Sequence, residues 1–116
     1  MEILKYTTIL HPARIKLGLS YDEYCIADAI KQLSTKTSKT PGWCHAGKDY
    51  LAKVLGITRK TVHKWLARLI EKGIVERNPD DRALLRTTDI WFNTVTLERE
   101  KMTTDYKQKN NLIKTK

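Results

Sequence analysis

Six of the seven residues from position 58 to position 64 carry side chains that can bind phosphate or the edge of a nucleic acid base. They comprise two hydroxyls, three cations and an imidazole, namely Thr58, Thr61, Arg59, Lys60, Lys64 and His63. An arginine or a lysine can donate hydrogen bonds to O6 and N7 of guanine, which discriminates against other bases by about 1–3 kcal/mol. Hydroxyl groups more often bind phosphate oxygens and fix the register of a protein on a duplex.

A helix over residues 58–72 would place these side chains on one surface. Thr58 is a favoured N-cap, because its hydroxyl can accept a hydrogen bond from the backbone N–H of Lys60 or Thr61. Gly73 predicts the end of the helix. Because the later turns of such a helix diverge from a duplex, we expect only its first turn and a half to read bases. The buried side is predicted by apolar residues at helical spacing, which are Val62, Leu66, Leu69 and Ile70.

A shorter helix over residues 48–55 would support the helix over residues 58–72. Its apolar residues share one side, and Gly56 supplies the positive φ that a tight turn needs. Two helices that meet at such a turn form a compact unit from which the second helix can project its outer face. Lys48 and Lys53, on the helix over residues 48–55, are candidate contacts to phosphate.

The order of these elements resembles the winged helix-turn-helix family. The match runs from about Gly47 to Arg77 and follows the form Leu-Ala-x-x-Leu-Gly-Ile-(Ser/Thr)-Arg-x-Thr-Val. Proteins of this form occur among bacterial regulators and among replication-initiation proteins of phages and plasmids. The residues that carry the resemblance are Leu51, Ala52, Leu55, Gly56, Ile57, Thr58, Arg59, Thr61 and Val62.

The resemblance implies a mainly helical α+β fold, with a three-helix core and a small antiparallel β-sheet that forms the wing. It also implies that the first residues of the second helix enter the major groove of double-stranded DNA. Arg59 lies at the helix start, where phosphate is a competing ligand, and His63 is either a base-edge donor or a solvated side chain. Carried over by position, base edges are assigned to Arg59, Lys60, His63 and Lys64, and phosphates to Thr58 and Thr61.

The N-terminal third of the chain predicts one further helix. Ser20 and Glu23 form a capping-box pattern ahead of a helix over residues 21–34. Pro12 is expected to break any earlier helix. Residues 34–42 are polar, end in Pro-Gly and predict a surface loop.

Three short strands complete the predicted domain. Residues 43–45 could form the first strand, and residues 74–77 and 90–96 predict an antiparallel pair. The sequence Asn-Pro-Asp-Asp at positions 78–81 predicts a turn between the last two.

The segment between these strands is the candidate wing. Arg82 and Arg86 are its candidate DNA contacts. Asp80 and Asp81 would be repelled by phosphate, by several tenths of a kcal/mol to about 1 kcal/mol each. We therefore expect the tip of the wing to point away from DNA.

The distribution of charge agrees with a polyanionic partner. The net charge is +9, and residues 57–77 hold six Lys or Arg against two acidic residues. Residues 78–97 carry two cations against three acids, whereas residues 98–116 carry six against three. Such asymmetry is typical of proteins that bind nucleic acid, although a basic surface can also simply maintain solubility. We predict a DNA-binding domain over residues 1–96 and a basic polar tail or helix over residues 97–116.

The sequence favours no catalytic, metal or cofactor site. The glycine-rich phosphate loop, the Ser/His/Asp arrangement and the paired carboxylates of common enzymes are not recognisable. Cys25 and Cys44 lack a paired spacing, and the histidines lack metal-ligand spacing, so we expect reduced thiols, no metal and a cytoplasmic protein. No apolar run approaches the roughly 20 residues that a membrane span requires.

The tryptophans are more simply explained by packing than by binding. Trp43 and Trp91 are predicted to be structural. Trp65 lies at the border between the buried stripe and the basic face, and we expect it to brace the second helix.

Three functions agree with this sequence. The first is a transcriptional regulator that binds double-stranded DNA, with a homodimer formed through the N-terminal arm or residues 97–116. The second is the origin-binding domain of a phage or plasmid replication protein. The third is a winged helix that binds an acidic protein partner.

Overall fold

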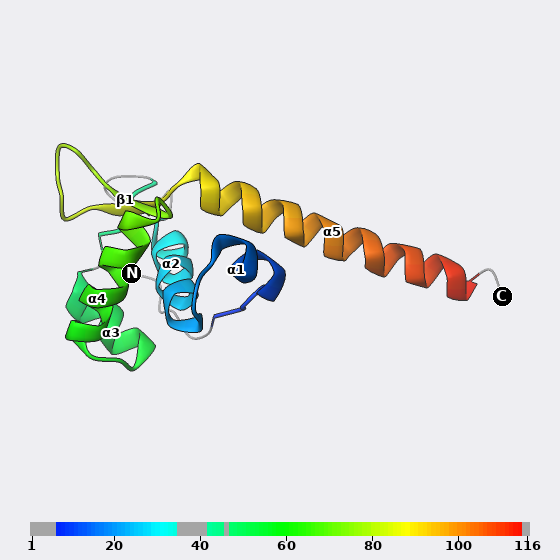
Figure 1. Ribbon diagram of the computed structural model, residues 1–116, viewed down its shortest axis with the longest axis horizontal. Helices are drawn as coiled ribbons and strands as arrows, with labels where there is room; N and C mark the ends of the chain where they lie inside the picture. The colour runs from blue at the N-terminus through cyan, green and yellow to red at the C-terminus, as the bar shows by residue number, and fades with distance from the viewer. Residues whose placement is uncertain (1–6, 35–41, 46, 115–116) are drawn as a thin grey trace.

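The computed structural model describes residues 7–34, 42–45 and 47–114, with side chains described as far as residue 104. Five helices and two strands follow one another along this part of the chain (Figure 1). The first six elements pack together, and the last helix extends away from them. In chain order they are α1 (His11–Leu17), α2 (Tyr21–Leu33), α3 (Lys48–Leu55), α4 (Arg59–Glu71), β1 (Val75–Arg77), β2 (Leu85–Thr87) and α5 (Asp89–Lys114).

Helix α2 confirms the capping box that the sequence predicts. The Ser20 hydroxyl accepts a hydrogen bond from the backbone N–H of Glu23, and the Glu23 carboxylate accepts one from the backbone N–H of Ser20. The helix then buries Tyr24, Ile26 and Ile30. Its end at Leu33 lies one residue before the predicted end.

Helix α1 shows that the expectation for Pro12 was wrong. Pro12 lies in the first turn of α1. A proline there removes no helical hydrogen bond, because the N–H groups of the first turn have no partner within the helix, and its fixed φ suits the helix. The guanidinium of Arg14 donates to the carbonyl of Leu19, which ties α1 to the start of α2 at an N–O distance of 2.9 Å.

The second wing strand lies earlier in the chain than predicted. Strand β2 pairs antiparallel with β1, with Val75 opposite Thr87 and Arg77 opposite Leu85. Residues 90–96 belong instead to α5, so the prediction of a strand there was wrong. Their β-branched and aromatic residues favour a strand locally, but Trp91, Val95 and Glu98 recur at helical spacing and are all buried.

Residues 43–45 contribute one strand-like bridge, as predicted in part. Cys44 pairs with Leu85, and the backbone N–H of each donates to the carbonyl of the other at 2.6 and 3.1 Å. In the predicted turn, the side-chain oxygen of Asn78 accepts from the backbone N–H groups of Asp80 and Asp81. The wing is thus anchored at its base and closed by side-chain hydrogen bonds at its start.

A single apolar cluster joins the helices to the wing. The rings of Tyr24 and Trp91 lie 4.7 Å apart between their centroids, and Trp91 is 2% exposed. This burial confirms the structural role predicted for Trp91. Other members of the cluster come from α3, α4, β1 and β2, and include Leu51, Val62, Leu66, Leu69, Val75 and Leu85.

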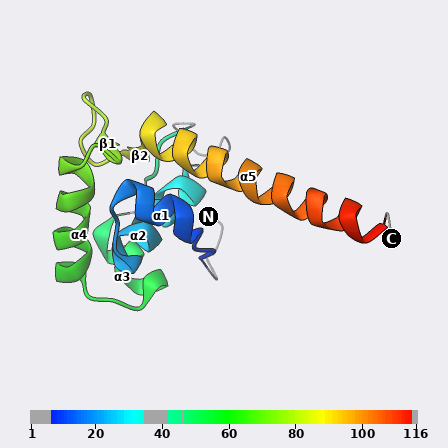
Figure 2. The ribbon, with the colours of Figure 1, turned by 45° about the vertical axis from the view of Figure 1, so that its right-hand side comes forward.

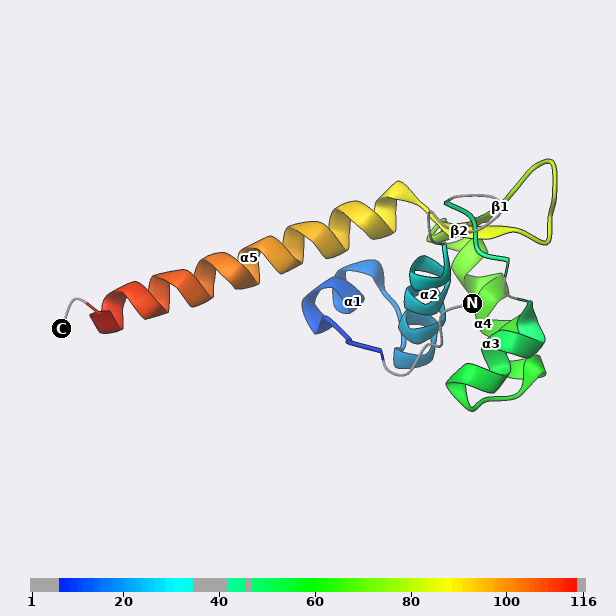
Figure 3. The ribbon, with the colours of Figure 1, turned by 180° about the vertical axis from the view of Figure 1, so that it is seen from behind.

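Helix α5 runs unbroken across residue 96, where the sequence predicts the domain to end. Its first turns pack on α1, where the Lys16 ammonium forms an ion pair with the buried Glu98 carboxylate. The Lys16 hydrogen bond lowers the pKa of Glu98, and the pKa of Lys16 is raised by the same bond. Viewed from behind, the helix leads away from α3 and α4 (Figure 3). Residues 97–114 are therefore helical, which was one of the two predicted states of this segment.

Candidate nucleic-acid interface

The turn between α3 and α4 has the predicted geometry. Gly56 caps α3 with a φ of 68°, a conformation that residues with a Cβ rarely adopt. The N–H of Ile57 then donates to the carbonyl of Ala52 at 3.1 Å. This sharp reversal allows α3 to pack against α4.

The N-cap of α4 ties its two threonine hydroxyls together. The Thr58 hydroxyl accepts from the backbone N–H of Thr61 at 3.1 Å, which confirms the predicted cap. The two hydroxyl oxygens also lie 2.8 Å apart, so one hydroxyl donates to the other. The cap therefore fixes both side chains at the exposed beginning of the helix.

One side of α4 is held against the rest of the domain. Val62, Leu66 and Leu69 are buried, and α2 and α3 both pack on this helix. At the far end, the Lys72 ammonium lies 3.0 Å from the Glu23 carboxylate and 2.8 Å from the carbonyl oxygen of Gly18. These contacts hold α4 along its length.

Trp65 lies at the border of the buried side, as expected. Its half-buried ring packs against the apolar cluster. The Lys64 ammonium and the Arg68 guanidinium lie 5.0 and 4.9 Å from the ring centroid. The ring thus braces the helix and orders two cations on its outer surface.

The opposite side of α4 is open to solvent along its first turns. Figure 2 shows α4 at the edge of the molecule, with α1, α2 and α3 to one side of it. A hollow of about 460 Å³ between the beginnings of α3 and α4 is lined by Lys48, Arg59, Lys60 and His63. Lys64 is exposed next to these residues, whereas Thr61 is half-buried. The structure thus brings Lys48 together with three of the four residues that the sequence assigns to base edges.

Sequence reasoning missed an acidic residue in this group. The Oδ1 atom of Asp49 lies 3.1 Å from Nε of Arg59, and the two side chains are 84% and 69% exposed. Asp49 is the second residue of α3, and Arg59 is the first residue of α4. In the sequence, the only signal for this contact was the position of Asp49 next to the cation Lys48, at the start of the helix predicted over residues 48–55.

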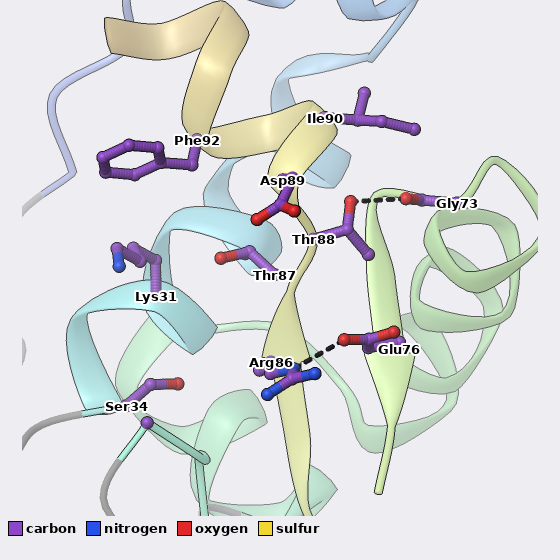
Figure 4. Close-up of a pocket in the computed structure, with 11 residues that line it drawn as sticks. Lys31, Ser34, Gly73, Glu76, Arg86, Thr87, Thr88, Asp89, Ile90 and Phe92 are labelled. Atoms are coloured by element: carbon purple, nitrogen blue, oxygen red, sulfur yellow. Dashed lines mark hydrogen bonds and ion pairs between the residues drawn. The ribbon is translucent and has the colours of Figure 1, made fainter.

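The wing arginines differ in their surroundings. Nε of Arg86 lies 2.5 Å from the Glu76 carboxylate on the paired strand (Figure 4), and its guanidinium lies 4.1 Å from the centroid of the Trp43 ring. Arg82 is exposed, and its carbonyl accepts from the guanidinium of Arg77 at 2.9 Å. Arg82 is therefore more available than Arg86 for an external ligand.

A second hollow lies between the end of α2, the wing and the start of α5. Its volume is about 650 Å³, and Figure 4 shows Lys31 and Phe92 on one side and Arg86 and Glu76 on another. The Thr88 hydroxyl, on its rim, donates to the carbonyl of Gly73 at 2.6 Å. This hollow is separate from the cationic hollow of α3 and α4, since the two share no lining residue.

Two other kinds of feature are absent from the described part of the chain. No group of three or more His, Cys, Asp or Glu side chains there could hold a metal ion. None of the helices described is both long and apolar enough to cross a bilayer.

Comparison with known proteins places this geometry in a fold. Residues 30–75 match the model of a family described as a helix-turn-helix domain. The crystal structure of the transcriptional regulator PA4135 superposes with a TM-score of 0.54 at 20% identity, covering 85% of this chain and 68% of that one. No curated protein matches the sequence. The chain therefore has the winged helix-turn-helix fold, and residues 30–75 are similar to the helix-turn-helix family.

Proposed function

We propose that this protein binds double-stranded DNA and catalyses no reaction. The observation that carries the proposal is the division of α4 into two sides. Val62, Leu66 and Leu69 anchor one side in the core, while Arg59, Lys60, His63 and Lys64 stand exposed on the other. A helix that is held firmly and is basic on its free side fits the major groove, which is wide enough to admit it.

The contacts divide by position along α4. Arg59 and Lys60 are the candidates for guanine, and His63 and Lys64 follow on the next turn. Thr58, Thr61 and Lys48 surround the beginning of the helix, where phosphate contacts set its register. Because α4 has 13 residues and is about 20 Å long, its last turns leave the groove.

The wing would add contacts to the DNA backbone. Arg82 is exposed and suits this role. Arg86 would first have to leave the Glu76 carboxylate and the Trp43 ring, so we expect a smaller contribution from it. With about five phosphates neutralised in total, the logarithm of the binding constant should fall with the logarithm of salt concentration at a slope near −4.5.

We infer that the DNA-binding role is regulatory. The structural neighbour PA4135 is described as a transcriptional regulator, which supports this inference. A single domain of this kind gives modest sequence preference, and we propose a homodimer on two half-sites, acting in the cytoplasm. Selection of bound sequences from a random duplex pool would recover a palindrome in that case. Direct repeats would instead favour the predicted origin-binding role.

The central experiment is a salt titration with a charge-reversed variant. Arg59→Glu/Lys60→Glu should weaken binding to random duplex DNA at least tenfold, with the slope reduced by about 2, because on DNA without a matching guanine both cations neutralise phosphates. Lys31→Glu/Arg99→Glu changes the net charge equally on α2 and α5 and is the matched control. Equal losses in both variants would contradict a specific role for α4. If the wild type bound no duplex DNA at low salt, the protein-interaction function would replace this proposal.

A further inference from the structure

We propose that Asp49 is a specificity-determining residue, which orients the Arg59 guanidinium toward a base edge. This inference rests on the proposed DNA-binding function. The Asp49 carboxylate and the Arg59 guanidinium meet across the α3–α4 turn at 3.1 Å between Oδ1 and Nε. Both side chains are mainly exposed, so the pair stands on the surface that the proposal directs at DNA.

The contact occupies only one edge of the guanidinium. Arginine has five N–H donors, and the ion pair with Asp49 brings the carboxylate closest to the Nε side of the guanidinium. The four donors on the two terminal nitrogens remain for another partner. Two of them in one plane match O6 and N7 of guanine, so a guanidinium that is already oriented meets the base with less loss of side-chain freedom.

Asp49 also limits where the guanidinium can go. Without this carboxylate, Arg59 can turn toward phosphate, which is the competing ligand at the start of a helix. Such a contact strengthens binding to every sequence equally. The acceptor at Asp49 therefore favours base recognition over phosphate binding by the same arginine.

The negative charge of Asp49 acts in a second way. Asp49 follows Lys48 in the chain and pairs with Arg59, and both of these cations line the hollow, so its carboxylate lies beside groups that would attract phosphate. It repels the duplex backbone and lowers affinity for random DNA. Repulsion weakens binding to every sequence, whereas only the orientation of Arg59 changes the ratio of specific to non-specific binding.

Two substitutions separate these effects. Asp49→Asn and Asp49→Ala both remove the charge and the acidic group from the first turn of α3, but only asparagine keeps a side-chain oxygen that can accept from Nε of Arg59. Folding of both variants is checked by thermal melts. Dissociation constants are then measured for random duplex, for the duplex that wild-type protein selects from a random pool, and for that duplex with each G·C pair replaced by A·T.

Both variants should bind random duplex about twofold to fivefold more tightly, because a repelling charge is gone. Only Asp49→Ala should lose discrimination against one G·C replacement, by about twofold to tenfold, because Arg59 is no longer ordered. In an Arg59→Ala background, Asp49→Ala should change that discrimination no further.

Each alternative outcome has a distinct meaning. Equal discrimination by wild type, Asp49→Asn and Asp49→Ala on a sequence that wild type does select would overturn this inference and leave the proposed function standing. The same is true if the two variants lose discrimination equally, since the effect would then come from charge alone. If the wild type binds no duplex DNA, the proposed function fails first.

Discussion

Removing the Lys72 ammonium should destabilise the domain in a pH-dependent manner. Lys72→Met keeps most of the alkyl chain but leaves the Glu23 carboxylate without its cation. Glu23 is 3% exposed, and Lys72 is 38% exposed. Loss of one partner from a fully buried ion pair costs about 3–5 kcal/mol, and solvent screening at Lys72 should reduce this to about 1–2 kcal/mol. That corresponds to a fall in Tm of about 4–8 °C.

The sign of the pH effect follows from the pKa of Glu23. Burial acts to raise this pKa, but hydrogen bonds from the Ser20 backbone and from Lys72 outweigh it, so the pKa lies below its ordinary value of 4.5. The carboxylate therefore stabilises the folded protein above pH 4.5, and this stabilisation is lost as the pH falls through the lower, folded-state pKa. Wild type and Lys72→Met should consequently differ most near neutral pH and converge in acid.

Urea denaturation at a series of pH values tests this reasoning. The difference in free energy of unfolding between wild type and variant should shrink below about pH 4. Glu23→Gln/Lys72→Met isolates the pair in a double-mutant cycle, and we expect a coupling energy of about 1 kcal/mol. A deficit that is the same at pH 3 and pH 7 would show that the loss comes from packing of the lysine stem, and would refute the electrostatic explanation.

Two further substitutions, each with a control at a neighbouring or comparable position, test the α3–α4 turn and the packing of α5. Gly56→Ala should cost about 1–2 kcal/mol, because φ is 68° and no atom lies within 4 Å of the new Cβ, so the cost is confined to the backbone. Gly47→Ser is the control, since Gly47 has an ordinary φ of −75° and lies at the N-cap of α3. It should be neutral or stabilising by a few tenths of a kcal/mol, and thermal melts measure both variants. Trp91→Ala should cost about 3–5 kcal/mol in urea denaturation, because the ring is buried against Tyr24. Phe92→Ala, at the neighbouring but 52% exposed position, should cost less than about 1 kcal/mol, and equal losses at the two positions would contradict the observed packing of α5.

The starts of α2 and α4, which are fixed by local hydrogen bonds, were predictable from the sequence. The side chains of Ser20 and Glu23 each accept from the other's backbone N–H, and the Thr58 hydroxyl accepts from the backbone N–H of Thr61. Gly56 marks the turn for an equally local reason, since only glycine adopts its backbone conformation without strain. Such features depend on neighbours in the chain and not on the rest of the fold.

The errors arose where tertiary packing decides between two local choices. Residues 90–96 favour a strand by composition, yet Trp91 gains more by packing on Tyr24 from a helix. The misplaced strand also hid the pairing of Glu76 with Arg86, which depends on the register of β1 and β2. Whether the candidate DNA contacts act as assigned stays a prediction.

The contact between Asp49 and Arg59 lay outside the reach of sequence patterns for another reason. The two residues are ten positions apart and belong to different helices. Their approach depends on the angle between α3 and α4, which the spacing of apolar residues does not determine. A site that is assembled across a turn therefore needs coordinates, even when each helix is predictable.

The projecting helix α5 has a consequence for how the particle behaves in solution. Its 26 residues give a length of about 39 Å, and the molecule measures 57 × 28 × 25 Å along its principal axes. A shape so elongated experiences more friction than a sphere of 13.5 kDa. A monomer should thus elute early from a gel-filtration column, at a volume that could be mistaken for that of a dimer. Sedimentation velocity separates mass from friction and would distinguish the two states.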